Sequence, residues 1–417
     1  MQLKTLLNFV EKHKGFVYEE RAELVRDRAA PELRVRIRPA KRSQGRCSRC
    51  GTPGPTYDTL DERRFQFVPL WGIMVFFLYA MRRISCAPCG RVVVEAVPWA
   101  KGKSPITLSL AWFLAAWAKR MSWDEVAHAF RVSWENVYAA VDLAVNYGLA
   151  HRNIDDVEVI GVDEIMWRRP GKFMTVVYAL DAGRRRLLWL GKDRKEETLN
   201  AFFDLFGDRA KRLRAVASDM WQPYLNVIKN RIPWALNVLD RFHITKNVHK
   251  AVDEVRAGEA RALAKKGQQT LKHSRWLLLK APTKLTRRQT VKLKDLLKIN
   301  LKTIRAYLLK EHLRQLWGHC TVTLGGAFLF DWCRQAKASQ LAPMARVART
   351  LQKKSDLVLN WFRVGGAISS AAVEGLNNKL KVVLRRSYGF RTEEGVTVAL
   401  YHALGQLPEP PLIHRFH

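Results

Sequence analysis

Acidic residues are scarce in this chain of 417 residues: 38 Asp and Glu accompany 72 Lys and Arg, which leaves a formal net charge of +34 at pH 7. A surface this basic repels itself unless a polyanion shares it, so nucleic acid is the leading partner. An unusually basic enzyme or a binder of anionic membranes is the alternative. Hydrophobic residues still make up 48% of the chain, which excludes disorder as its main state and suffices for several cores.

Long apolar runs are also missing. The two longest, residues 68–81 and 106–118, fall short of the roughly 20 residues that a membrane span requires. The first ten residues lack the basic start, apolar run and small-residue cleavage site of a secretory signal. We therefore expect no transmembrane segment, no membrane partner and a location inside the cell.

Cysteine is rare, and its six occurrences argue against a disulfide framework. Four of them form two Cys-x-x-Cys pairs, each followed by glycine: Cys47 with Cys50, and Cys86 with Cys89. Doubled spacing of this kind is typical of four thiolates that close a tetrahedron around one structural Zn²⁺. The Phe- and Val-rich segment between the pairs indicates the strands of a zinc ribbon. A redox pair or chance spacing is the alternative.

After Pro105 the pattern becomes helical. Apolar spacing predicts a first helix over residues 108–119. Ser122 and Glu125 then form a capping box, which opens a second helix through residue 130. These signals predict two short helices in succession.

A third helix, residues 134–147, follows a short turn and can be capped by Ser133. The three helices resemble a DNA-binding helix-turn-helix, although Arg131 stands where such motifs usually turn on glycine. A plain three-helix packing unit is the alternative. In the DNA-binding interpretation, four residues at the start of the third helix face the major groove: Trp134, Glu135, Asn136 and Tyr138.

From residue 157 the pattern switches to strands. Three apolar runs predict a meander, a helix with an aromatic face follows, and two further runs predict two more strands. The predicted strands are residues 157–162, 173–180, 187–190, 213–217 and 235–239. The order βββαβαβ predicts a mixed α/β sheet.

Two of these strands run into a carboxylate. Asp163 follows the first strand and Asp219 the fourth, and carboxylates at the ends of adjacent strands can lie close enough to bridge magnesium ions. Asp240 ends the fifth strand and competes for the second position. Its alternative role is to cap the next helix, with His243 packed beside it. Glu164 is expected to be a neighbour of the metals rather than a ligand, as is Asp181.

The last third of the chain is helical by pattern. Residues 244–368 predict an all-helical insertion in which basic residues and tryptophans recur, so that it could follow a DNA backbone. Beyond it, Glu374, Asn377 and Lys381 share one polar face of an amphipathic helix. A lone glutamate on such a helix is usually a solvated charge, and nothing local distinguishes Glu374.

Five segments of the sequence resemble, in order and character, the bacterial insertion-sequence transposases of the ISL3 family. They are Gly161-Val-Asp163-Glu164, Ser218-Asp219-Met-Trp-Gln-Pro-Tyr224, Asp240-Arg-Phe-His243, Val373-Glu374-Gly-Leu-Asn377-Asn-Lys-Leu-Lys381 and Tyr388-Gly-Phe-Arg391. The resemblance covers nearly the whole chain. It implies a zinc ribbon, a helix-turn-helix and a ribonuclease-H-like domain in succession.

The resemblance also implies a site and an activity. Asp163, Asp219 and Glu374 would be the catalytic carboxylates that hold two Mg²⁺ or Mn²⁺ ions. Residues expected beside them are Glu164, Asp240, His243, Asn377 and Lys381. The enzyme would bind the terminal inverted repeats of its element, cleave the DNA and transfer the strands to target DNA, as a homodimer or larger oligomer in the bacterial cytoplasm near the nucleoid. A DNA-binding regulator and a purely hydrolytic nuclease are the alternatives.

These inferences divide the chain into five parts. They are an N-terminal segment with the zinc ribbon (1–105), the helix-turn-helix (106–152), the first part of the catalytic domain (153–243), the helical insertion (244–368) and the C-terminal helical part of the catalytic domain (369–417). Residues 1–46 carry no clear signal beyond an amphipathic start and a basic stretch over 34–46, which is usually a solvated face.

Overall fold

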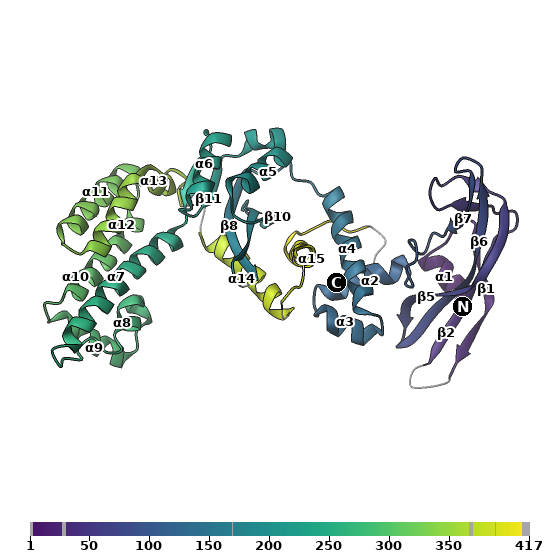
Figure 1. The fold of residues 1–417 in the computed structure, drawn as a ribbon, viewed down its shortest axis with the longest axis horizontal. Helices are drawn as coiled ribbons and strands as arrows, with labels where there is room; N and C mark the ends of the chain where they lie inside the picture. The colour runs from purple at the N-terminus through teal and green to yellow at the C-terminus, as the bar shows by residue number, and fades with distance from the viewer. Residues whose placement is uncertain (1–2, 27–30, 169, 367–369, 388, 411–417) are drawn as a thin grey trace. The chain divides into compact units, whose positions relative to one another are not determined.

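The computed structural model describes residues 3–26, 31–168, 170–366, 370–387 and 389–410. The chain forms two compact units, one made of Met1–Arg152 with Val383–His417 and the other of Asn153–Val382. Figure 1 labels most of the helices and strands of both. The predicted last part, 369–417, is therefore divided between the two units rather than belonging to the catalytic part as a whole.

A seven-stranded sheet forms the N-terminal part of the first unit. Its elements are α1 (Leu3–Val10), β1 (Phe16–Val25), β2 (Glu32–Pro39), β3 (Gly45–Cys47), β4 (Pro53–Gly54), β5 (Thr56–Leu70), β6 (Ile73–Cys86) and β7 (Arg91–Ala96). Strands β5 and β6 form a long antiparallel hairpin, and β2 joins β6 in parallel. Phe65, Phe77 and Trp99 are fully buried in the core of this sheet.

The basic stretch that begins at residue 34 is in part a strand and not only a solvated face. In β2, Val35 and Ile37 are buried while Arg36 and Arg38 are exposed. This alternation has the period of two that places one face of a strand on a core. The arginines conceal the pattern because they dominate the average polarity of the segment.

His13 makes the stability of this sheet sensitive to pH. Its ring lies 5.3 Å from that of Trp99 and 5.8 Å from that of Tyr18, and burial lowers the pKa of His13 to about 4. Since the unfolded chain binds this proton more tightly, stability is lost as pH falls from about 6.5 toward 4. We expect His13 to remove about 2 kcal/mol of unfolding free energy between pH 7.5 and pH 5. Urea unfolding at both pH values should show a correspondingly smaller loss in His13→Gln, whereas an equal loss in both proteins would show that another group is responsible.

Three helices follow the sheet at the predicted places. They are α2 (Leu108–Ala118), α3 (Trp123–Phe130) and α4 (Trp134–His151). The predicted capping box is confirmed, because Ser122 Oγ accepts the Glu125 amide and the Glu125 carboxylate accepts the Ser122 amide. Arg131 adopts the left-handed conformation, with φ of 52°, that glycine usually supplies in such a turn.

A fourth helix, α15 (Glu393–Leu404), returns from the C-terminal region to pack against α4. Beyond its end, Leu407 lies so close to α4 that a Cβ built on Gly148 would stand 2.5 Å from the Leu407 Cβ. Arg386 donates to the carbonyl oxygens of Ala118, Arg120 and Met121 at the end of α2. These contacts explain why the last part of the chain belongs to the first unit.

The second unit contains a five-stranded sheet in the order β10-β9-β8-β11-β12. The strands are β8 (Val159–Arg168), β9 (Lys172–Ala179), β10 (Arg186–Lys192), β11 (Ala215–Ser218) and β12 (Leu236–Leu239). The first three are antiparallel to one another, while β8, β11 and β12 run parallel. Helices α5 (Glu196–Phe206) and α6 (Gln222–Arg231) bury their apolar faces against the sheet. The predicted order βββαβαβ is thus confirmed.

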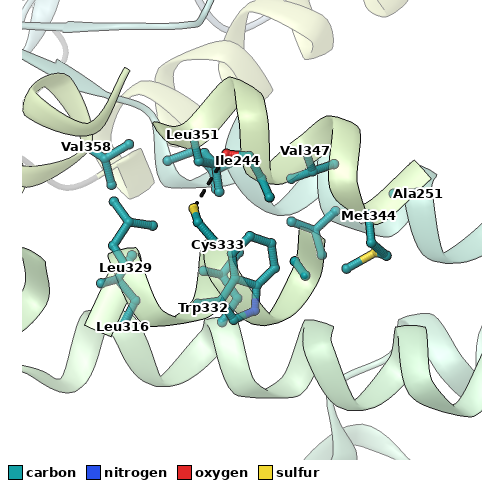
Figure 2. Packing of buried hydrophobic residues seen from close by; sticks show 14 of the residues in the cluster. Ile244, Ala251, Leu316, Leu329, Trp332, Cys333, Met344, Val347, Leu351 and Val358 are labelled. Carbon is teal, nitrogen blue, oxygen red and sulfur yellow. Dashed lines mark hydrogen bonds between the residues drawn. The ribbon is translucent and has the colours of Figure 1, made fainter. Parts of the chain in front are cut away.

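The rest of this unit is helical, as predicted. Its helices are α7 (Arg241–Ala264), α8 (Arg275–Leu279), α9 (Arg287–Leu297), α10 (Lys302–Arg314), α11 (Val322–Ala338), α12 (Ala342–Lys353), α13 (Ser355–Arg363) and α14 (Ser370–Arg386). Figure 2 shows the core of this bundle, where Trp332 and Cys333 of α11 meet Met344 and Leu351 of α12. Of the described helices, none combines the length and the apolar character needed to cross a membrane.

Candidate active site and metal centre

Three aspartates occupy matching positions on three neighbouring strands. Where β8 pairs with β11, Val162 lies opposite Ser218, and where β11 pairs with β12, Ser218 lies opposite Leu239. The next residue along each strand is Asp163, Asp219 and Asp240 respectively. The register therefore aligns three carboxylates in one row at the end of β11.

The prediction that the first strand of this sheet ends just before Asp163 is wrong, because β8 continues beyond that residue. The strand continues to Arg168 and pairs with β9 along this length, with Asp163 opposite Val176. On its other side β11 stops at Ser218, so that edge of β8 is open from Asp163 onward. Asp163 thus stands at an unpaired edge within β8 rather than at the end of the strand.

Asp163 and Asp219 are held by hydrogen bonds in a buried setting. Asp163 is 7% exposed, and its carboxylate accepts the Glu164 amide at 2.7 Å and Nδ2 of Asn377 at 2.5 Å. Burial raises the pKa of Asp163, and it raises the pKa of Asp219 to about 6. The Trp221 amide donates to Asp219 Oδ1 at 2.9 Å. Both carboxylates are costly to ionise without a cation, and a bound divalent ion reverses that penalty.

Asp240 caps α7, which was the alternative role considered for it. Its Oδ1 accepts the Phe242 amide at 2.8 Å, and His243 Nδ1 lies 3.4 Å from its Oδ2. The neighbouring carboxylate raises the pKa of His243. Capping does not remove Asp240 from the site, since it lines the same small pocket as the other two aspartates. We call this the aspartate pocket, and its lining includes Asp163, Asp219, Asp240, Arg241, His243, Trp361 and Val373.

Helix α14 contacts β8 beside this pocket. A Cβ built on Gly161 would lie 3.1 Å from Cγ2 of Val373 and 3.0 Å from Cδ1 of Leu180, so glycine permits the close approach. Asn377, one turn further along α14, accepts from Tyr178 Oη at 2.8 Å while it donates to Asp163. Of the predicted neighbours, Asn377 therefore contacts a catalytic candidate directly.

A side chain at residue 161 should push α14 away from the sheet. We expect Gly161→Val to lower the unfolding free energy by about 1–3 kcal/mol, because the added methyl groups overlap Val373 in a packed core. Urea unfolding of the whole chain measures this. The matched control is Gly375→Ala on α14, where a Cβ would meet nothing within 4 Å and where alanine favours the helix. Equal stability of Gly161→Val and the wild type would show that α14 does not rest on β8.

Glu374 does not stand in the aspartate pocket. It is exposed and lines an adjacent groove, which shares Arg241 and Trp361 with that pocket. In the described part of the chain, only the four paired cysteines form a group of three or more metal-ligating side chains whose ligand atoms all lie within 4.8 Å of one another. The structure thus brings the three aspartates to one pocket and leaves Glu374 at its margin.

The other predicted neighbours have different surroundings. Glu164 is paired with Arg194 at 3.1 Å, and the Arg194 guanidinium lies over the Trp221 ring. Lys381 is exposed and lines neither the aspartate pocket nor the groove. Asp181 is not near the aspartate pocket, because its carboxylate accepts the Glu158 amide just before β8 begins. Asp181 lies at the opposite end of the sheet because β9 runs antiparallel to β8.

The two Cys-x-x-Cys pairs come together in the first unit. Cys47 ends β3 and Cys86 ends β6, and their partners follow in tight turns whose glycines, Gly51 and Gly90, have positive φ. Sγ atoms of opposite pairs lie 3.9 Å apart (Cys47 to Cys89) and 3.4 Å apart (Cys50 to Cys86). Ligands 2.3 Å from a tetrahedral zinc ion are about 3.8 Å apart, so the donor set and its spacing fit Zn²⁺.

The start of α4 carries an aromatic cluster. Trp134 is 45% exposed and its ring stacks on that of Tyr138, with centroids 5.7 Å apart. Both rings contact Trp123 of α3, which also meets Phe390. Of the other two predicted DNA-contacting residues, Glu135 is exposed and Asn136 is half-buried. Their role in reading DNA stays a prediction.

Two side chains that shape the site were not singled out from the sequence. Tyr178 holds Asn377, and Arg194 neutralises Glu164. A tyrosine in an apolar strand could have been noticed, because a buried hydroxyl needs a partner. No local signal marks Arg194, whose partner is distant in sequence. Trp361, one of the recurring tryptophans of the predicted insertion, lines both the pocket and the groove.

Known families and structures show what this chain is similar to. A family model described as transposase, of the DDE type and the ISL3 group, matches residues 160–398. The transposase for insertion sequence element IS1001 of Bordetella parapertussis is 29% identical over 84% of this chain and 86% of its own length. The transposase for IS1557 of Mycobacterium tuberculosis is 29% identical over 95% of this chain and 94% of its own.

Among solved structures, the Drosophila P element transposase strand transfer complex matches with a TM-score of 0.37 and 10% identity, over 72% of this chain and 92% of that one. The family match alone spans more than half of the chain, and it includes both the row of aspartates and α14. The chain therefore belongs to the ISL3 family of DDE transposases, and its function is DNA transposition.

Proposed function

We propose that this transposase cleaves DNA at the ends of its insertion sequence and joins those ends to target DNA at a two-metal site formed by Asp163, Asp219 and Glu374. The observation that carries the proposal is the row of carboxylates on adjacent strands. Those strands belong to a mixed sheet whose order, β10-β9-β8-β11-β12, supports our inference of a ribonuclease-H-like fold.

The donors fit magnesium or manganese. Both cations prefer carboxylate oxygen, and Asp163 and Asp219 offer it in a buried pocket where each is costly to ionise alone. Asp219 follows β11, which pairs directly with β8, whereas Asp240 follows β12, one strand further away. Neighbouring strands are about 4.8 Å apart, so Asp219 is the better partner for Asp163.

Glu374 becomes the third metal ligand by a rotation of its side chain. Val373 and Asn377, which precede and follow it on α14, already contact β8. The helix therefore stands beside β8, and we propose that the Glu374 side chain turns from the groove toward the aspartates. The groove and the pocket adjoin, since Arg241 and Trp361 line both.

Asp163, Asp219 and Glu374 would hold the two ions, whose chemistry would be activation of a water or a 3′-hydroxyl and neutralisation of charge on the phosphate. The protein positions the groups around that phosphate. Asn377 holds Asp163 in orientation, Tyr178 fixes Asn377, and Arg241 supplies a positive charge at the pocket wall. No covalent link between protein and DNA is required.

The first unit would select the DNA. We assign one Zn²⁺ to Cys47, Cys50, Cys86 and Cys89, and terminal-repeat binding to the zinc ribbon together with α3 and α4. Two element ends must be brought together for transposition, so the active form on DNA would be a homodimer or a larger oligomer.

The test is an excision and integration assay in cells, with a marker flanked by the element's repeats, comparing the wild type with Glu374→Gln. We expect only the wild type to move the marker. Glu197→Gln, an exposed glutamate of α5, is the matched control and should keep activity. If Glu374→Gln moves the marker as well as the wild type does, the ligand set is wrong. If no protein moves it although all bind the repeats, a regulator is favoured; cleaved ends without joined products indicate a hydrolytic nuclease.

A further inference from the structure

Asp163 and Asp219 stand at the point where the sheet ceases to join their strands. The backbone pairing of β8 with β11 ends at Val162 and Ser218, the residues just before the two aspartates. Beyond them β8 continues along an open edge, whereas the chain after β11 turns through three residues into α6. The separation of the two carboxylates therefore depends on side-chain contacts as well as on the sheet.

Arg194, two residues after β10, makes contacts on both sides of this point. Its Nη1 donates to both carboxylate oxygens of Glu164, at 3.1 and 3.2 Å, and Glu164 directly follows Asp163. Its guanidinium also lies 4.7 Å from the centroid of the Trp221 ring, and its carbonyl oxygen accepts the Trp221 indole N–H at 3.0 Å. The Trp221 amide in turn donates to Asp219. One arginine thus connects the neighbour of one aspartate to the group that holds the other.

Arg194 is itself held in place by its surroundings. Its guanidinium lies 4.2 Å from the centroid of the Phe173 ring on β9. The preceding residue, Asp193, has a φ of 65°, and its carboxylate accepts the Lys195 amide and the Thr198 hydroxyl. These hydrogen bonds fix the turn between β10 and α5, so the arginine projects from a rigid backbone.

An arginine suits this place better than a lysine would. A guanidinium is planar, stacks on aromatic faces and presents its donors in fixed directions, whereas an ammonium is a strongly hydrated point charge on a flexible stem. The side chains of Arg194 and Glu164 are 37% and 25% exposed, so their ion pair is partly shielded from water and salt. The pair can therefore hold a geometry in addition to balancing charge.

We propose that Arg194 is a positioning residue: through Glu164 and Trp221 it sets the separation of the two aspartates and thereby the affinity of the site for divalent metal. The inference rests on the proposed function, since it takes those aspartates as metal ligands. Two ions about 3.5–4 Å apart require carboxylates at a defined spacing. Residues that orient metal ligands without contacting the metal typically change its affinity by about 10- to 100-fold.

The test is a titration of the full chain with Mn²⁺ in the absence of DNA, in which electron paramagnetic resonance measures the free ion. We expect Arg194→Lys to bind Mn²⁺ about 10- to 100-fold more weakly than the wild type. The matched control is Arg231→Lys at the other end of α6. Arg231 is also 37% exposed and also paired with a carboxylate, and its substitution should leave Mn²⁺ binding unchanged.

Cleavage of an element end at increasing Mg²⁺ concentration separates positioning from general damage. Misplaced ligands should raise the Mg²⁺ concentration that gives half the maximal rate, by a factor similar to the loss of Mn²⁺ affinity, while saturating metal restores most of the rate. Loss of folded protein lowers the maximal rate without this shift. Trp221→Phe keeps a ring beside Arg194 and loses the indole N–H, so we expect a smaller shift in the same direction. It decides the question if Arg194→Lys does not fold.

The outcomes distinguish this inference from the proposed function. If Asp219→Asn binds Mn²⁺ as tightly as the wild type, the metal site itself is wrong. If Asp219→Asn loses Mn²⁺ whereas Arg194→Lys and Trp221→Phe keep it, the metal site stands and Arg194 does not position it. Equal weakening by Arg194→Lys and Arg231→Lys, or a lower maximal rate with an unchanged Mg²⁺ dependence, would also overturn the inference.

Discussion

Asp219→Asn should lower the rate of DNA strand cleavage by about a thousandfold or more, while binding to the element ends stays within about twofold of the wild type. An amide offers a weaker donor and no charge, so the site loses several kcal/mol of stabilisation for the charge that develops on the phosphate; about 4 kcal/mol corresponds to a thousandfold. The loss falls on the chemical step because Asp219 belongs to the second unit, whereas the proposed DNA-reading residues belong to the first. Single-turnover cleavage of a labelled element end measures the rate, and a band-shift titration measures binding.

Two matched substitutions on the same sheet sharpen this result. Asp181→Asn changes an aspartate at the opposite end of the sheet and should leave cleavage unchanged. Asp240→Asn changes the third aspartate of the row and should reduce the rate by less than about tenfold, because that residue caps α7 and lies one strand further from Asp163. If Asp240→Asn is as inactive as Asp219→Asn, or if Asp219→Asn cleaves normally, the second metal ligand has been assigned incorrectly.

The parts of this fold that could be predicted are those set by local chemistry. Ser122 and Glu125 form a capping box because the chain that follows them is helical. The period of the apolar residues is enough to distinguish strands from helices. The positions of Asp163 and Asp219 followed from the same reasoning, because each comes directly after an apolar run. Local pattern therefore located two of the three proposed catalytic carboxylates.

What could not be predicted depends on contacts between distant segments. Asn377 reaches Asp163 only because Gly161 lets α14 approach β8, and no pattern within α14 contains that information. The position of Glu374 at the margin of the pocket depends on the same packing. Similarly, no local pattern in α15 identifies α4 as its partner, although the two helices pack together and Leu407, beyond the end of α15, meets Gly148 of α4. Periodicity predicts the helix α14, but only the family resemblance points to Glu374 as a ligand.

Arginine residues can also make a strand hard to recognise, even where its apolar residues have the period of a strand. In β2, arginines alternate with Val35 and Ile37, and the high net charge led to an interpretation of the segment as a solvated face. At Asp240 the capping interpretation is confirmed, while its role as a metal ligand stays a prediction. Asp240 is a helix cap and also lines the aspartate pocket, because the first turn of α7 begins at the end of β12.

Removal of the proposed zinc should have the largest effect on stability of any change considered for this chain. The strands next to the first cysteine pair are short, since β3, which ends at Cys47, has three residues and its partner β4 has two, and the local core consists of Cys47, Ile84 and Cys86. So small a core cannot hold four thiol groups together, whereas structural zinc contributes roughly 10–16 kcal/mol of apparent binding free energy in small domains. We expect Cys86→Ser to lose the metal and at least about 4 kcal/mol of the unfolding free energy of the first unit.

Zinc content per chain and urea unfolding together test this expectation, and Cys320→Ser provides the matched control. Cys320 is exposed, belongs to the second unit and has no place in the four-cysteine group, so its substitution should leave one zinc per chain and an unchanged unfolding curve. Cys86→Ser should weaken binding to the element ends, because the cysteines belong to the unit that would bind them. It leaves the row of aspartates intact, so a reaction assembled at high protein concentration should still cut DNA. A Cys86→Ser protein that retains one zinc ion, or that unfolds like the wild type, would show that the cysteines form no structural metal site.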